Sequence, residues 1–169
     1  MTFDLPGVEP GSDIEKLFKG IGFVVVQWGF AEQSLDLIVA SIFHAFDGHP
    51  SLKRRPQHLE PKIEFLTECF TTFPELAQFK VEGEALMDRF SATGKMRNDL
   101  VHGAITATSE EDGAFMFLKI DVRGKQPHSV RSIFLDDSDW TDFRRELLRL
   151  GKDGQSLTRR VWDTLKERT

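Results

Sequence analysis

The residues from Arg97 to His102 combine side-chain types that are suited to chemistry on a phosphodiester. Arg97 supplies a permanent cation whose planar fork binds phosphate oxygens in pairs. His102 carries an imidazole, the side chain best matched to proton transfer near neutral pH. Asn98 directly follows the arginine and adds an amide. Together these side chains favour phosphodiester chemistry that needs no metal ion, and the sequence predicts no cofactor.

The motif comes at the end of a predicted helix. The helix runs from about Leu76 to His102, and Gly103 can end it. One row of its residues repeats at steps of three and four: Phe79, Gly83, Leu86, Phe90, Gly94, Arg97 and Val101. Arg97 therefore continues an apolar row that faces inward. The same spacing recurs from Arg123 to His128, but Gly124 and Pro127 favour a turn there.

A single helix does not bring the two key side chains to one face. Asn98 and His102 are four residues apart and share a face, whereas Arg97 and His102 lie about 140° apart. Either the long Arg97 side chain curls around the helix, or two copies of the chain pool their residues across a two-fold axis. We expect a homodimer. The structural alternative is an ion network, in which His102 caps the last carbonyls and Arg97 pairs with a carboxylate.

The stretch from Arg97 to His102 resembles the Arg-polar-x-x-x-His signature of the HEPN superfamily, whose members are helical nucleotide-binding domains. The resemblance covers about residues 13–103. Many members of that superfamily are metal-independent endoribonucleases in toxin and antiviral systems. The resemblance implies attack of an RNA 2′-hydroxyl on the adjacent phosphate. His102 would move protons, Arg97 would stabilise charge on the phosphoryl oxygens, and Asn98 would orient the phosphate or the imidazole.

The resemblance also bears on partners. It implies RNA as the substrate, a site formed between paired domains, and an antitoxin or another regulatory protein as a partner. The alternative function is a non-catalytic HEPN-like dimer that binds a partner protein or a nucleotide, since a fold alone does not fix function.

Two further groups of residues are candidates for the site. Trp28 and Glu32 are four apart on one face of the first predicted helix. A carboxylate among apolar neighbours needs a partner if it is buried, and Arg97 on a facing helix is the candidate; an exposed Glu32 is equally open. Lys53, Arg54 and Arg55 form a compact basic loop that could bind substrate or be solvated surface.

Composition bounds the class of protein. The chain has 169 residues, 40% of them hydrophobic and 29% charged, which fits one globular domain, residues 1–169. The net charge of −5 argues against a general nucleic-acid coat but allows a small basic site. The lone Cys69 excludes an internal disulfide and a multi-cysteine zinc site, and nothing fixes His44, His49 and His58 as metal ligands.

The sequence also predicts a location. No secretory signal is apparent at the start of the chain. The stretch from Ile21 to Phe46 is apolar enough to consider as a membrane span, but Gln27, Glu32 and Asp36 interrupt it and favour a buried helix. We therefore expect a cytoplasmic protein that does not use a membrane.

The predicted fold is mainly α within the α+β class. A flexible lead-in, 1–12, precedes a HEPN-like helical core, 13–103, with helices at about 13–46, 61–73 and 76–102. Three antiparallel strands follow within 104–135, at 104–108, 114–122 and 129–135. The remainder, 136–169, is predicted to form two helices, at about 140–150 and 156–166, separated at Gly151 and Gly154.

Overall fold

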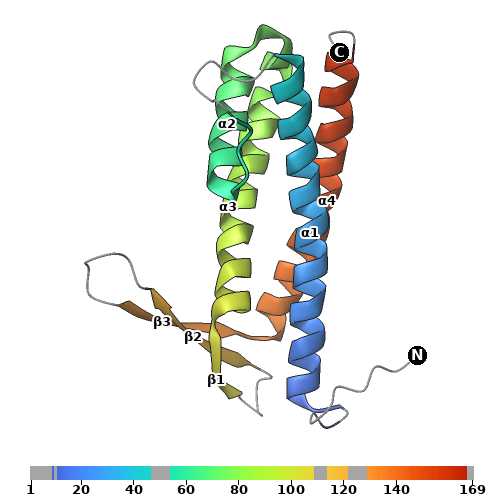
Figure 1. Ribbon diagram of the computed structural model, residues 1–169. Helices are drawn as coiled ribbons and strands as arrows, with labels where there is room; N and C mark the ends of the chain where they lie inside the picture. Colours follow the sequence, from blue (N-terminus) through green and yellow to red (C-terminus); the bar gives the residue numbers. More distant parts are fainter. Residues whose placement is uncertain (1–8, 10, 47–53, 109–113, 122–128, 167–169) are drawn as a thin grey trace. The chain divides into compact units, whose positions relative to one another are not determined.

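The computed structural model describes residues 9, 11–46, 54–108, 114–121 and 129–166, and it confirms a mainly helical α+β fold (Figure 1). The helices are α1 (Asp13–Ala45), α2 (Leu59–Thr72), the 3₁₀ helix η1 (Pro74–Phe79), α3 (Lys80–His102) and α4 (Asp137–Leu165). The strands are β1 (Ala104–Thr108), β2 (Phe115–Asp121) and β3 (Ser129–Leu135). Two compact units divide the chain, one of residues 1–26 and 95–145 and the other of 27–94 and 146–169. We call them the motif unit and the helical unit, after their contents.

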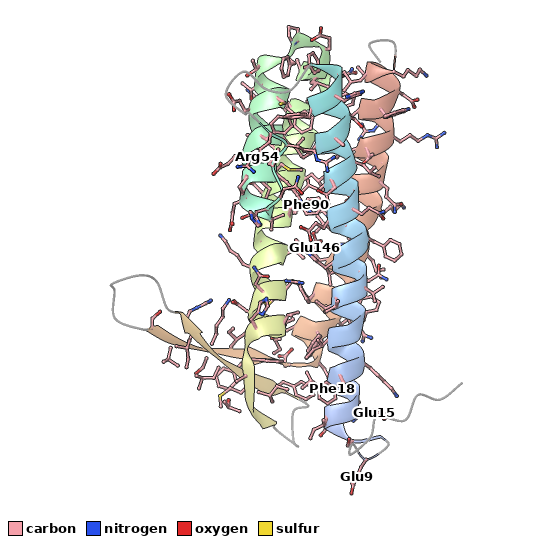
Figure 2. The ribbon with its side chains drawn as sticks, in the orientation of Figure 1. Glu9, Glu15, Phe18, Arg54, Phe90 and Glu146 are labelled. Atoms are coloured by element: carbon pink, nitrogen blue, oxygen red, sulfur yellow. The ribbon has the colours of Figure 1, made fainter. Side chains whose placement is uncertain are left out.

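The helical unit is built from the later part of α1, from α2 and η1, and from parts of α3 and α4. Apolar residues at helical spacing are fully buried in it, among them Leu35, Ile38, Phe70, Phe90 and Leu157. Figure 2 shows Phe90 among these helices, and its ring meets that of Trp28 edge-on at 6.1 Å between centroids. The core of this unit therefore follows from the period of its apolar residues.

The motif unit packs the three-stranded sheet against helix ends. The strand order is β1-β2-β3, and both neighbouring pairs are antiparallel. Phe115 and Phe117 alternate along β2 and are buried together with Leu135 of β3. Trp140 of α4 meets Phe115 edge-on at 6.4 Å between ring centroids. The sheet thus has one buried face, as period-two alternation requires.

The start of α1 agrees with the sequence. The Ser12 hydroxyl accepts a hydrogen bond from the Glu15 N–H at 3.3 Å, and the Glu15 carboxylate accepts one from the Gly11 N–H at 2.6 Å. A side chain at the cap and a carboxylate three residues later satisfy free N–H groups at the start of a helix.

The prediction of two C-terminal helices was wrong, because α4 continues through Gly151 and Gly154. Arg89 of α3 pairs with Glu146 at 2.7 Å and with Asp153 at 2.8 Å, and so holds α4 on both sides of Gly151. Packing of the buried apolar face outweighs the low helix propensity of glycine.

Gly154 has a packing role of its own in the helical unit. A Cβ built there would fall on the Ser34 hydroxyl oxygen and lie 3.2 Å from the Ser34 Cβ, so glycine lets α4 approach α1 closely. Gly151 differs, since nothing lies within 4 Å of an added Cβ.

The third predicted helix was partly wrong at its start. Residues 74–79 form η1, and α3 begins at Lys80. The bounds of the strands differ from the prediction by at most a residue at each end. Most of the predicted lead-in, the turn at 112–113 and the repeat of the motif spacing at 123–128 lie outside the described residues.

Helix α1 is, among the described helices, the one long and apolar enough to cross a membrane by length and composition. Of the 18-residue window that meets this test, 39% is buried inside the protein. Its buried residues include Ala31, Leu35, Ile38 and Ile42, which belong to the core of the helical unit.

The two glycines of α4 give a matched pair of substitutions. We expect Gly151→Ala to raise the free energy of unfolding by about 0.5–1 kcal/mol, because alanine is the better helix former and has free space there. We expect Gly154→Ala to lower it by about 1–3 kcal/mol, since Ser34 must move. Urea unfolding followed by circular dichroism measures both changes. Equal effects at the two positions would contradict this account of Gly154.

Candidate functional site

The motif occupies the last turns of α3 in the motif unit. Arg97 is half-buried, whereas Asn98 and His102 are exposed. The Arg97 Nη1 donates a hydrogen bond to the Asn98 Oδ1 at 2.9 Å. The Arg97 Nε is buried and has no hydrogen-bond partner among the described residues. Asn98 therefore orients the guanidinium of Arg97, a more specific role than its position in the sequence suggested.

Between these residues, Asp99 points into the protein and binds the sheet. Its side chain is 12% exposed, and its Oδ1 accepts hydrogen bonds from Lys119 Nζ at 2.6 Å and from Arg131 Nη2 at 3.0 Å. Lys119 of β2 and Arg131 of β3 are directly opposite in the register of the sheet. One carboxylate thus joins the end of α3 to two strands.

Gly103 continues this attachment beyond the helix. A Cβ at this position would lie 2.5 Å from the Asp99 carbonyl oxygen and 3.2 Å from the Phe117 Cβ. Leu100, one helical turn before β1, is 2% exposed. No larger residue than glycine fits between the last turn of α3 and β2, so the position of His102 is fixed from both sides.

These contacts bear on the structural alternative for the motif. An ion network does exist at the end of α3, but it runs through Asp99. Within the part of the chain that the structure describes, Arg97 and His102 form no ion pair, and His102 makes no side-chain hydrogen bond. Asp99, between them, makes the structural ion pairs, while His102 is exposed and Arg97 is half-buried.

The helix is regular from Lys80 to His102, so the angular argument from the sequence holds. Arg97 and His102 lie about 140° apart around α3, while Asn98 and His102 share a face. The hydrogen bond from Arg97 to Asn98 turns the guanidinium toward the face that carries His102. The bond therefore brings the guanidinium part of the way around the helix toward the imidazole of His102.

Trp28 and Glu32 belong to the helical unit and form a separate cluster. The Trp28 Nε1 donates to Glu32 Oε2 at 2.8 Å, as the four-residue spacing suggests. The sequence suggested Arg97 as a partner for Glu32; the partner that the structure gives is Lys62, 3% exposed, with its Nζ 3.3 Å from Glu32 and 2.8 Å from Asp36. This cluster joins α1 to α2. The sequence analysis missed Lys62, because a lysine at the start of a helix is usually exposed.

The basic loop lies before α2. Arg54 and Arg55 are exposed, Figure 2 shows Arg54 at the outside of the helical unit, and Lys53 lies outside the described residues. Arg54 and Arg55 form no ion pair within the described chain, so both cations are open to solvent or to an anionic ligand.

A metal site and a nucleophilic thiol find no support among the described residues. No group of three or more His, Cys, Asp and Glu side chains that could hold a metal lies among the described residues. Cys69 is fully buried in α2, and burial together with the nearby Glu68 raises the pKa of its thiol to about 12. A thiol with this pKa is not a nucleophile at neutral pH.

Removing the charge of Asp99 tests the attachment of α3 to the sheet. We expect Asp99→Asn to lower the free energy of unfolding by about 2 kcal/mol, because two cations lose their shared carboxylate. Asp142→Asn is the matched control: it breaks an exposed pair with Arg145 and should cost less than about 1 kcal/mol. Urea unfolding measures both, and similar losses would refute a special role for Asp99.

The reactivity of Cys69 tests its burial. We expect iodoacetamide at pH 8 to leave the native protein unmodified over the time in which it fully alkylates the protein in urea, since a thiol with a raised pKa stays protonated at that pH. Mass spectrometry of the two samples gives the answer. Alkylation of native and unfolded protein at comparable rates would show that the thiol is accessible.

Comparison of the chain with protein-family models, with curated proteins and with solved structures found no match. The likeness to the HEPN superfamily therefore rests on the motif and the helical architecture alone.

Proposed function

We propose that this protein is a HEPN-like, metal-independent endoribonuclease whose site is formed by Arg97, Asn98 and His102. The observation that carries the proposal is the division of roles at the end of α3. Asp99 takes up the ion pairs that anchor the helix, and Arg97 and His102 have no ion-pair partner among the described residues. A cation and an imidazole in that condition are available to a phosphodiester.

The proposed reaction begins with the 2′-hydroxyl of one ribonucleotide. The proton of this hydroxyl is removed as its oxygen forms a bond to the adjacent phosphorus, and the bond from phosphorus to the 5′-oxygen breaks. The departing oxygen takes up a proton, which leaves a cyclic phosphate and a 5′-hydroxyl end. His102 transfers the protons, and Arg97, oriented by Asn98, stabilises the charge on the phosphoryl oxygens.

The proposal includes a homodimer. The outer face of the sheet, in the same unit as the motif, exposes Ile120 (59%), Val130 (58%) and Phe134 (67%). The charged side chains Lys119 and Arg131 belong to the inner face, where they reach Asp99. A two-fold axis would therefore pack this apolar face on itself without opposing like charges.

The second candidate function is a non-catalytic dimer that binds a partner protein or a nucleotide. One observation favours it: Arg97 and His102 leave a single straight helix about 140° apart, so one copy alone does not aim both at one phosphate. The two candidates differ in whether RNA is cut.

A cleavage assay in EDTA tests the proposal. We expect the wild-type protein to cut RNA from a mixture of structured and unstructured substrates and to leave 2′,3′-cyclic phosphate ends. Arg97→Ala and His102→Ala should each lower the rate at least about 100-fold, since each removes a group acting on the reacting atoms. Gel electrophoresis gives the rates, and mass spectrometry identifies the ends.

Matched variants separate catalysis from structure. His44→Ala and Arg145→Ala remove an exposed histidine and an exposed arginine that do not belong to the motif, and we expect neither to slow cleavage. Phe134→Asp should lower dimer content, measured by sedimentation, because it puts a charge on the exposed apolar face of the sheet. Binding of RNA or nucleotide without cleavage by a dimeric wild-type protein would refute the nuclease and favour the second candidate.

A further inference from the structure

The helical unit contains a groove between α1 and α4 that the proposed nuclease does not use. It encloses about 670 Å³ and is lined by α1 from Phe30 to His44 and by α4 from Gln155 to Trp162. Figure 1 shows these two helices side by side in this unit. Phe30, Leu37 and Trp162 line it with 52%, 52% and 53% of their surface exposed. Large apolar side chains that are exposed around one groove indicate a binding surface.

The groove is shaped for an elongated occupant. From Phe30 to His44, α1 extends for about 20 Å. The residues that α1 presents to the groove repeat at steps of three and four, namely Phe30, Gln33, Leu37, Ala40 and His44. The α4 stripe that lines the groove repeats in the same way, namely Gln155, Arg159 and Trp162. Two such stripes form the holes that receive the side chains of a third helix.

The hydroxyl groups in the groove already donate hydrogen bonds within the protein. The Ser34 Oγ donates to the Ala31 carbonyl at 2.6 Å, and the Ser41 Oγ donates to the Leu37 carbonyl at 2.8 Å. The Thr158 Oγ1 donates to the carbonyls of Gly154 at 2.8 Å and Ser34 at 3.1 Å. Because helix carbonyls accept these hydrogen bonds, the groove can be covered by an apolar surface without leaving a hydroxyl donor unsatisfied.

The charged side chain among the residues that line the groove is a cation. Arg159 lines the groove and forms no ion pair within the described chain. Lys152 lies on the same face of α4, two helical turns before Arg159. None of the described residues that line the groove carries a carboxylate. The nearby acids of α1, Glu32 and Asp36, pair with Lys62 of α2. A protein of net charge −5 thus has a basic edge along an apolar groove.

We propose that this groove binds an amphipathic α-helix of another protein whose apolar stripe is flanked by Glu and Asp. The apolar side chains of that helix enter between Phe30, Leu37 and Trp162, and its carboxylates pair with Arg159. A second copy of this chain fits less well, since a two-fold axis through the groove would bring Arg159 of each copy toward the other, with no carboxylate among the described residues of either lining. The proposal is independent of the nuclease activity.

Two designed peptides of about four helical turns test the proposal with the full-length protein. Both carry leucine at steps of three and four; one has glutamate beside the leucines and the other has lysine at the same positions. Titration calorimetry measures Kd for each. We expect the glutamate peptide to bind at least about ten-fold more tightly than the lysine peptide, because only its charges complement Arg159 and Lys152.

Variants locate the binding on the protein. Arg159→Glu should reverse the preference between the two peptides, and Leu37→Asp should weaken the glutamate peptide at least about ten-fold. Leu148→Asp is the matched control, since Leu148 is 51% exposed on α4 and does not line the groove; it should leave Kd unchanged. All three side chains are exposed, and Arg159→Glu alone decides the result if Leu37→Asp does not fold.

Four outcomes would overturn the proposal. The first is equal binding, or none, for the two peptides. The second is binding of dodecanoate, lost in Arg159→Glu, without peptide binding, which would assign the groove to a small amphipathic anion. The third is binding to phosphatidylserine vesicles that depends on Trp162, again without peptide binding. The last is loss of a homodimer in Leu37→Asp, which would assign the groove to a second copy.

Discussion

The site depends on a single carboxylate placed between two like charges. Lys119 and Arg131 are directly opposite each other on the inner face of the sheet, an arrangement that is unfavourable when nothing lies between them. Asp99 accepts hydrogen bonds from both, at 2.6 and 3.0 Å. Its negative charge offsets the repulsion between the two cations and attaches α3 to the sheet. Because Asp99 belongs to α3, this attachment also fixes the rotation of the last helical turn. The direction in which Arg97 and His102 leave the helix follows from it.

The motif therefore combines two tasks in neighbouring residues. On a regular helix Asp99 lies about 160° from Arg97, so anchoring the aspartate to the sheet leaves the guanidinium on the far side. The exposed His102 and the closely packed Gly103 show the same division at the end of the helix. A helix that was anchored through Arg97 would not have its cation available for a ligand. The functional interpretation rests on this contrast within one turn of helix.

Much of the fold could be predicted from the sequence, because apolar periodicity decides which residues are buried. The strands at Ala104 and Ser129 begin where the pattern indicates. The continuity of α4 could not be predicted, since it depends on Ser34 and Arg89 from other helices, and local propensity at Gly151 and Gly154 carries no information about them. The role of Asp99 could not be predicted from the sequence either, for a related reason. It depends on the register that pairs Lys119 with Arg131, and a shift of one residue would turn Lys119 to the other face.

The groove between α1 and α4 and the end of α3 differ in whether their polar side chains already have partners. In the groove, Ser34, Ser41 and Thr158 donate to helix carbonyls, so an apolar partner covers the hydroxyls at no cost in lost hydrogen bonds. At the end of α3, Arg97 and the exposed His102 form no ion pair among the described residues, and a guanidinium without a carboxylate favours an anion such as a phosphoryl group. The polar groups thus favour the apolar stripe of an amphipathic helix at one surface and an anion at the other. Since the surfaces lie in different units, each assignment stands on its own contacts.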